Sequence, residues 1–229
     1  MRVAMVSGGG RGLGAAIVRR LLADGWALSL GLRDLSQAAQ FGGEVFAHPF
    51  EATDPAAAAP WVAATAERFG RIDALVNNAG IYRFVDFDSG SEDDLDAMWA
   101  INVKGPFRLI REAMPHLRRA GAGRVVNIAS TDAKRFRADS SIGYAMSKHA
   151  LLALTQAAKF AGWADGVRAT AICPGAIETD LVPKIPGTTP AGERLTPQTV
   201  AQIVALALSL PNQASLPEIV VNTRLEPLI

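Results

Sequence analysis

The chain has 229 residues, of which 49% are hydrophobic and 20% are charged, and its 23 basic residues nearly balance 22 acidic ones. A chain of this length buries a large core without a metal or a disulfide, and its apolar content excludes intrinsic disorder. The formal net charge of +1 argues against a nucleic-acid partner, because such proteins usually carry a clear excess of basic residues.

Cysteine usage and hydropathy bound the cellular setting. Cys173 is the only cysteine, so neither an intrachain disulfide nor a multi-cysteine metal site can form, which fits a reducing compartment. No window approaches about 18 uninterrupted apolar residues, and the N-terminal apolar run is too short for a signal peptide. The three histidines show no metal-ligand spacing. We therefore expect a cytoplasmic protein with no membrane span and no metal.

Apolar runs and helical periodicity alternate along the chain. The runs predict strands over Val3–Ser7, Ala27–Gly31, Ala74–Asn77, Arg124–Ala129 and Ala169–Cys173. Apolar residues recurring every three or four positions predict helices over Leu13–Asp24, Ala56–Phe69, Glu92–Arg119 and Ser141–Trp163. Near-continuously apolar strands that alternate with helices indicate a parallel sheet covered on both faces. We expect residues 1–229 to form one α/β domain with a doubly wound, Rossmann-type sheet.

A proline-rich stretch follows the fifth predicted strand. Five prolines lie between Pro174 and Pro197, which is too many for a long helix. Loops of this kind beside a strand end commonly carry function, so we expect a mobile substrate loop at about residues 176–198.

The first predicted strand leads directly into a glycine-rich turn, Ser7-Gly8-Gly9-Gly10-Arg11-Gly12-Leu13-Gly14, and a predicted helix follows. Glycines here permit a tight turn and let backbone N–H groups approach a pyrophosphate at the helix N-terminus. The glycines fit both a G-x-G-x-x-A and a G-x-x-x-G-x-G spacing. Alone, such a turn is modest evidence for nucleotide binding, and the missing Gly-Lys-Ser/Thr argues against phosphate transfer.

A second motif is Tyr144 with Lys148, four residues apart on a predicted helix and therefore on one face. An ammonium held beside a phenol favours the phenolate and lowers the tyrosine pKa, which makes the phenol a usable general acid or base. In isolation the pair means little, because tyrosine and lysine at this spacing are common on solvated helices.

Taken together, the motifs resemble those of the short-chain dehydrogenase/reductase family over nearly the whole chain. The matching elements, in chain order, are the turn Ser7–Gly14, Asn77-Asn78-Ala79-Gly80, Asn102, Ser130, the pair Tyr144 and Lys148, and Pro174-Gly175 through Thr179. Six elements in family order make coincidence improbable. The interval from Ser130 to Tyr144 is one residue longer than the commonest family spacing, so Thr131 is the alternative to Ser130.

The resemblance implies hydride transfer between a nicotinamide and a small carbonyl or alcohol substrate. Tyr144 would exchange the proton, Lys148 would lower the pKa of Tyr144 and bind the nicotinamide ribose, Ser130 would hydrogen-bond the substrate oxygen, and Asn102 would hold a water. The implied cofactor-binding residues are Ser7, Gly8, Gly10, Arg11, Gly12, Leu13, Gly14, Arg33, Asn78, Ala79, Gly80, Tyr144, Lys148, Pro174, Gly175, Ile177 and Thr179. Two alternatives stay open: a nicotinamide-binding regulator without turnover, and an epimerase or lyase of the same fold.

The proline four residues after Asn102 bears on the role of Asn102. Pro106 has no N–H, so the carbonyl four residues earlier, that of Asn102, loses its helical partner. Either this carbonyl marks a water site beside a kink, or the proline merely bends a packed helix.

Cofactor choice depends on the residues after the second strand, where an acid accepts from the ribose 2′-hydroxyl or a basic residue meets a 2′-phosphate. Leu32 takes the place of the acid in family register, Arg33 follows it, and Arg11 is a second nearby cation. Asp34 is the opposing signal, but it lies two positions further along and can pair with Arg33. We expect NADP(H) to be preferred, with NAD(H) possible.

The substrate pocket is expected to be largely apolar, with walls from Tyr82, Phe84, Phe136, Ile142, Ile177, Leu181 and Val182. The run Lys134-Arg135-Phe136-Arg137 precedes Tyr144 and is either solvated loop charge or an attractant for an anionic substrate. Small residues in the helix Ser141–Trp163 and the excess apolar surface of Glu92–Arg119 predict a homodimer or homotetramer.

Overall fold

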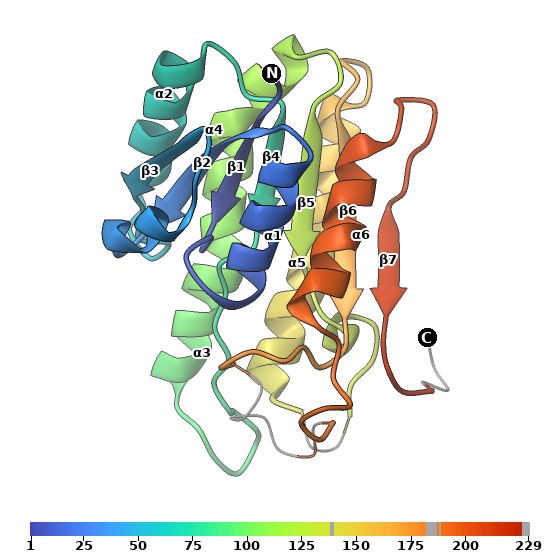
Figure 1. Cartoon of the computed structure of the whole chain (residues 1–229). Helices are drawn as coiled ribbons and strands as arrows, with labels where there is room; N and C mark the ends of the chain where they lie inside the picture. The colour runs from blue at the N-terminus through green and yellow to red at the C-terminus, as the bar shows by residue number, and fades with distance from the viewer. Residues whose placement is uncertain (138–139, 182–186, 188, 226–229) are drawn as a thin grey trace.

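The computed structural model describes residues 1–137, 140–181, 187 and 189–225. These residues form a seven-stranded, entirely parallel sheet in the order β3-β2-β1-β4-β5-β6-β7 (Figure 1). The strands are β1 (Val3–Ser7), β2 (Ala27–Leu32), β3 (Val45–Pro49), β4 (Ala74–Asn77), β5 (Arg124–Ile128), β6 (Arg168–Pro174) and β7 (Glu218–Val221).

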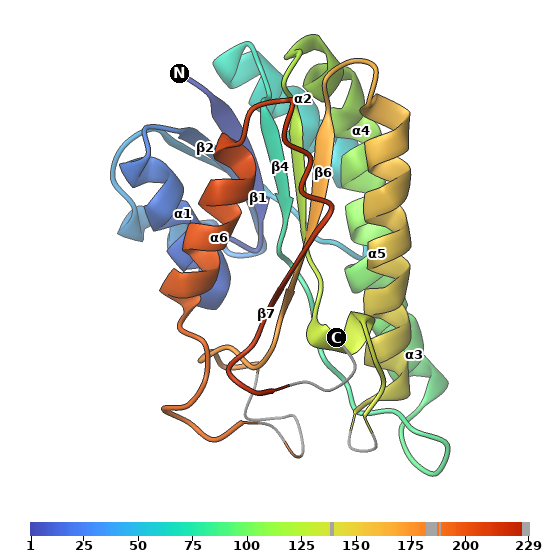
Figure 2. The same ribbon diagram turned by 90° about the vertical axis from the view of Figure 1, so that its right-hand side faces the viewer.

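Helices cover both faces of the sheet, as Figure 2 shows with the sheet between them. One face carries α1 (Gly12–Ala23) and α6 (Pro197–Ser209), and the other carries α2 (Ala58–Phe69), α4 (Gly105–Arg119) and α5 (Ile142–Gly162). The shorter segments are α3 (Glu92–Trp99), η1 (Leu35–Gln40), η2 (Ala100–Lys104) and η3 (Thr131–Ala133). The expected doubly wound α/β architecture is thereby confirmed. None of the described helices is long and apolar enough to cross a membrane.

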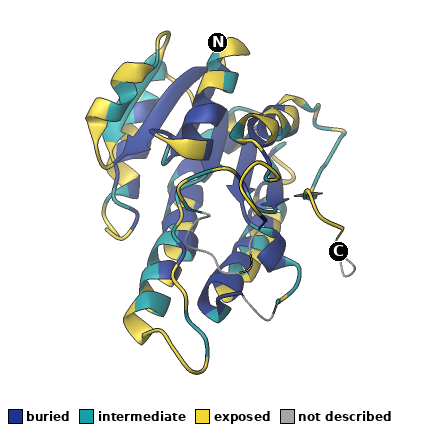
Figure 3. Ribbon diagram, turned by 60° about the horizontal axis from the view of Figure 1, so that its bottom comes forward, coloured by how far each residue is buried: buried dark blue, intermediate teal, exposed yellow. Residues whose placement is uncertain are grey.

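The sheet separates two apolar cores because strand side chains alternate between its faces. In β1, Ala4 and Val6 pack beneath α1 and α6, whereas Met5 packs beneath α2 and α4. The central strands are buried throughout, while much of the exposed surface lies in loops and on the outer sides of helices (Figure 3). The central strands are therefore mainly apolar, as a sheet covered on both faces favours, although buried polar residues such as Ser29 and Asn127 lie among them.

The predicted strands Val3–Ser7 and Ala74–Asn77 are confirmed to the residue, and the other three differ by one residue at one or both ends. The edge strands β3 and β7 were not among the predicted strands, because they are only half-buried and their apolar runs are just three residues long. Also unpredicted was α6, whose Pro197 occupies the first helical turn, where proline is favoured. The predicted substrate loop at about 176–198 therefore ends where α6 begins, and residues 182–186 and 188 of it lie outside the described residues.

The predicted helix Glu92–Arg119 is not one regular helix. It divides into α3, the π-helical turn η2 and α4, and the Gly105 N–H bonds to the carbonyl of Ala100, five residues back. Pro106 explains the break, since it cannot donate the regular bond to the carbonyl of Asn102. A π-turn inside a helix frequently marks a functional position, and Asn102 lies in this one.

Candidate active site

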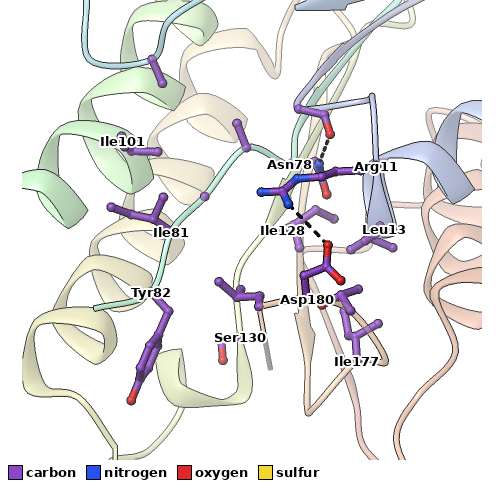
Figure 4. Close-up of a pocket in the computed structure, with 18 of the residues that line it drawn as sticks. Arg11, Leu13, Asn78, Ile81, Tyr82, Ile101, Ile128, Ser130, Ile177 and Asp180 are labelled. Carbon is purple, nitrogen blue, oxygen red and sulfur yellow. Dashed lines mark hydrogen bonds and ion pairs between the residues drawn. The ribbon is translucent and has the colours of Figure 1, made fainter. Parts of the chain in front are cut away.

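A cleft of about 830 Å³ opens at the carboxyl ends of the strands, where the sheet order reverses between β1 and β4 (Figure 4). This is where ligands bind in open parallel sheets. Of the predicted site residues, only Ser7 and Asn102 do not line it. Those that do are Gly8, Gly10, Arg11, Gly12, Leu13, Gly14, Arg33, Asn78, Ala79, Gly80, Ser130, Tyr144, Lys148, Pro174, Gly175, Ile177 and Thr179, together with the alternative Thr131.

The glycine turn needs its glycines for space and for conformation. Gly8 and Gly12 have φ angles of 66° and 51°, and a Cβ atom on Gly14 would collide with the carbonyl of Gly8. At Gly12 a Cβ atom would meet only Thr179, at 3.5 Å, so the turn leaves an open cradle across from residue 179. Among the described residues, no side chain caps the N-terminus of α1. These free N–H groups and this cradle fit the pyrophosphate of a dinucleotide.

Ser7 lies behind the residues that line the cleft and links the ends of two strands. Its Oγ accepts hydrogen bonds from the backbone N–H groups of Asn78 and Ala79, each at 3.1 Å. The Asn78 side chain donates in return to the carbonyls of Ser7 and Gly8, both at 3.1 Å. The ends of β1 and β4 are thus held together, and Ser7 is a positioning residue, 2% exposed, without access to the cleft.

Asn102 also lies behind the wall. Its Oδ1 accepts from the Ile81 N–H at 2.9 Å, and its Nδ2 donates to the Ile81 carbonyl at 3.0 Å and to Ser147 Oγ at 3.1 Å. A Cβ atom at Gly80 would lie 3.3 Å from Asn102 Oδ1 and 3.6 Å from Lys148 Nζ. The amide and the ammonium therefore border the same small space, which glycine keeps open.

Ser130, Tyr144 and Lys148 meet in the part of the cleft beyond Gly80. Lys148 Nζ lies 5.5 Å from the centre of the Tyr144 ring and donates to the Ile128 carbonyl at 2.8 Å. Burial lowers the pKa of Lys148 to about 8. Burial and the nearby Asp132 carboxylate raise the pKa of Tyr144 above its ordinary value, although a hydrogen bond with the Ser130 side chain opposes the rise.

The expectation that Lys148 lowers the pKa of Tyr144 is therefore wrong for this structure. The ammonium bonds to a backbone carbonyl instead of the phenol, and desolvation dominates for both groups. A tyrosine with a raised pKa keeps its proton at neutral pH and so remains a proton donor.

The lowered pKa of Lys148 predicts a pH-dependent stability. Between pH 8 and about 10 the unfolded chain holds the Lys148 proton and the folded chain releases it, so stability rises with pH across this window. We expect the free energy of unfolding of wild type, relative to Lys148→Met, to rise by roughly 1–3 kcal/mol from pH 7 to pH 10. Urea unfolding at four pH values measures it, with Lys159→Met on the same helix as the control. A constant difference between wild type and Lys148→Met would contradict the assignment.

Ser130 and Thr131 have different partners. The Ser130 side chain bonds with Tyr144 and also accepts from the Asp132 N–H at 3.1 Å, as the N-cap of η3. Thr131 is 4% exposed, and its hydroxyl lies 3.4 Å from the guanidinium of Arg135. This arrangement favours Ser130 over Thr131 as the residue beside the reacting groups.

At the far end of the cleft, the residues after β2 are arranged around Arg33. Leu32 is buried, whereas Arg33 is exposed and makes no hydrogen bond or ion pair with any described residue. The Asp34 carboxylate accepts from Ser36 N at 3.0 Å and Ser36 Oγ at 2.6 Å, which lowers its pKa. The expected pairing of Arg33 with Asp34 is therefore absent, because Asp34 caps η1 instead.

Arg11 has an acidic partner. Its guanidinium forms a 3.4 Å ion pair with Asp180 across the cleft, and both side chains are largely exposed (Figure 4). An exposed pair of this kind contributes little stability, so Arg11 remains available to a stronger anionic partner.

The expected apolar pocket is only partly correct. Tyr82, Ile177 and Leu181 line the cleft, but Phe84, Phe136 and Ile142 do not. Val182 lies outside the described residues. The lining residues outside the expected pocket and cofactor set include Gln37, Arg83, Asp132, Arg137 and Asp180, most of them charged. For Arg137 alone there was a signal, the basic run before Tyr144.

Residues 2–189 match the family model described as short chain dehydrogenase. The chain is 38% identical over 226 residues to agropine synthesis reductase of Rhizobium rhizogenes, covering 94% of this chain and 51% of that protein. It is 38% identical over 192 residues to levodione reductase of Leifsonia aquatica, covering 79% of this chain and 71% of that one.

A solved structure agrees with the sequence comparisons. The alcohol dehydrogenase of Thermococcus sibiricus, complexed with 5-hydroxy-NADP, superposes with a TM-score of 0.86 and 30% identity over 96% of this chain and 95% of that one. The chain spans about half the length of the agropine synthesis reductases. The sheet order, the cleft and these matches lead to one conclusion: the chain belongs to the short-chain dehydrogenase/reductase family.

Proposed function

We propose that the protein is an NADP(H)-dependent oxidoreductase that interconverts a small or medium-sized carbonyl compound and its alcohol. The observation that carries this proposal is the convergence of Ser130, Tyr144 and Lys148 in the same cleft as the open glycine turn. The names of the related reductases and the NADP analogue bound to the Thermococcus sibiricus enzyme support it.

The residues divide the work by position. When bound, the reduced nicotinamide would supply the hydride that the carbonyl carbon receives. Tyr144 gives its proton to the oxygen that develops negative charge, and Ser130 donates a hydrogen bond to the same oxygen. Lys148 would hold the nicotinamide ribose, and Asn102 keeps the Ile81 segment and the space beside Lys148 in place. The glycine turn, Asn78, Ala79, Gly80 and the Pro174–Thr179 segment hold the rest of the cofactor.

The direct test follows the absorbance of the reduced cofactor in both directions. The purified protein is mixed with NADPH or NADH and a panel of aldehydes and ketones, and separately with NADP⁺ or NAD⁺ and a panel of alcohols. Net oxidation of NADPH with matching formation of alcohol supports the proposal. Cofactor binding without turnover of any substrate would favour a regulator. Product formation without net change in the cofactor would favour an epimerase or lyase.

We also infer that the chain forms one catalytic domain and works in a reducing cytoplasm. All seven described strands belong to one sheet, which supports a single catalytic domain. The lone cysteine, buried at the end of β6, fits a reducing cytoplasm. The agropine synthesis reductases are about twice as long as this chain, so we do not assign their substrates to this protein.

A homodimer or homotetramer is part of the same proposal. Four large apolar side chains are exposed: Trp99 at the end of α3, Phe107 in α4, Phe160 in α5 and Trp163 just after α5. Contact between subunits would bury them. We expect light scattering to give a mass at least twice the 24.1 kDa of one chain. Phe107→Glu should lower that mass, whereas Phe87→Glu, on a loop, should not. A wild-type mass near 24.1 kDa would refute the oligomer.

A further inference from the structure

The end of the cleft nearest Tyr144 carries more charge than a pocket for a neutral carbonyl compound needs. Asp132 and Arg137 lie there, alongside Tyr82. Arg83 also lines the cleft, but it pairs with Asp94 at 3.6 Å. Burying charged groups is costly unless they are paired, so their pairing shows which of them are free to meet a ligand.

Asp132 pairs with an arginine of its own loop. It is 5% exposed, and its carboxylate accepts from the Arg135 guanidinium at 2.8 Å. Both of these side chains are less than a tenth exposed, which makes the pair a fixed part of the wall. The same Asp132 oxygen lies 3.7 Å from Arg137 Nε, too far for a good hydrogen bond. Asp132 thus orients Arg137 without using its donors.

Arg137 therefore keeps its hydrogen-bonding capacity. Its Nε atom is buried and has no hydrogen-bond partner among the described residues, although its side chain is 29% exposed overall. Lys134, three residues earlier in the same basic run, differs, because it pairs with Glu218 at 2.6 Å. Arg137 is the member of the run that lines the cleft, and its planar guanidinium can hold a carboxylate through two parallel bonds.

Tyr82 supplies a second unused donor. The residue is 3% exposed, and its buried hydroxyl oxygen lies near the backbone N–H of Ser141, but no described residue accepts the hydroxyl proton. Its ring centre lies 5.1 Å from that of Tyr144, so it stands next to the proposed proton donor. The hydroxyls of Tyr82 and Ser130 point toward the same end of the cleft in Figure 4. A buried hydroxyl whose proton has no acceptor is costly, and a ligand that accepts from it recovers that cost.

We propose that this end of the cleft binds the carboxylate of an oxo acid or hydroxy acid, through the Arg137 guanidinium and the Tyr82 hydroxyl. Because Tyr82 lies against Tyr144, the carboxylate is only a few bonds from the carbon that is reduced or oxidised. This inference names the substrate class of the proposed oxidoreductase and rests on that function.

The first test measures binding alone. Butanoate and its neutral isostere butanamide are titrated calorimetrically into the protein saturated with NADP⁺, which occupies the glycine turn, and into the protein without cofactor. We expect butanoate to bind at least ~10-fold more tightly than butanamide, since a hydrogen bond to a charged group contributes about 1.5–3 kcal/mol. Arg137→Gln should remove this preference, Arg137→Lys should restore part of it, and Tyr82→Phe should reduce it.

Two controls separate recognition from folding. Arg111→Gln removes an exposed arginine on α4 that does not line the cleft, and it should leave both affinities unchanged. The melting temperature and NADP⁺ affinity of Arg137→Gln should match those of wild type. Equal affinity for butanoate and butanamide, no saturable butanoate binding, or an unchanged preference in Arg137→Gln would overturn the inference.

The second test compares turnover of 3-oxobutanoate and 4-oxopentanoate with that of their methyl esters. We expect Arg137→Gln to lower kcat/KM for the acids by about 10–100-fold and to leave the esters within a few-fold. Retained ester turnover with no acid-specific loss would refute carboxylate recognition while the oxidoreductase function stands. Arg137-dependent butanoate binding with no redox turnover at all would refute the function and leave the carboxylate site.

Discussion

Replacing Tyr144 by phenylalanine is expected to lower kcat by at least about 100-fold, the usual scale for loss of a general acid or base. The phenol is 7% exposed, bonds with the Ser130 side chain and holds its proton strongly because burial raises its pKa. Phenylalanine keeps the ring packed against Tyr82 and removes only the proton donor. Steady-state kinetics of the purified variant with the best carbonyl substrate measures the effect.

The comparison requires that Tyr144→Phe still folds and binds cofactor. We expect its NADPH affinity, measured by fluorescence titration, to stay within a few-fold of wild type, since Lys148 and the glycine turn are untouched. Its free energy of unfolding should change little, because the apolar contacts of the ring remain. Activity within a few-fold of wild type would show that Tyr144 is not the proton donor.

The central sheet could be predicted from sequence because of its burial. Strands covered on both faces are mostly apolar, and runs such as those of β1 and β4, each polar only at its last residue, are easily found. The half-buried edge strand β3 includes His48 and Pro49, so its pattern resembles a loop. Its position comes from pairing with β2, a tertiary contact that no local pattern contains.

The candidate site was predictable where spacing fixes geometry. Tyr144 and Lys148 lie on one helix face because they are four residues apart. The glycine turn lies at the end of β1, a strand that its apolar run predicts. Loop side chains have no such rule. Phe136 was expected inside the pocket and is 53% exposed, whereas Arg137, the next residue, lines the cleft.

The ionisation of Tyr144 shows a second limit. Sequence places an ammonium four residues away, and that neighbour alone would lower the tyrosine pKa. The sign of the shift depends on burial and on where the ammonium bonds, and Lys148 bonds to the Ile128 carbonyl. Both are properties of the packed fold, so spacing alone gave the wrong direction.

Cofactor choice is expected to rest on Arg33. Leu32 is buried and cannot accept from a ribose 2′-hydroxyl, and the Asp34 carboxylate is occupied by Ser36. Arg33 lines the cleft and has no partner among the described residues, so it can meet a 2′-phosphate without breaking another bond. We expect kcat/KM for NADPH to exceed that for NADH by about 10–100-fold in wild type.

Variants of the two cleft arginines test this assignment. Arg33→Ala should remove most of the NADPH preference by lowering kcat/KM for NADPH while leaving that for NADH nearly unchanged. Arg11→Ala should cause a smaller loss, because Arg11 shares its charge with Asp180. Arg20→Ala, on α1 and paired with Asp24 outside the cleft, is the control for removing a positive charge. Equal use of both cofactors by wild type, or an unchanged preference in both Arg33→Ala and Arg11→Ala, would show that these arginines do not select the cofactor.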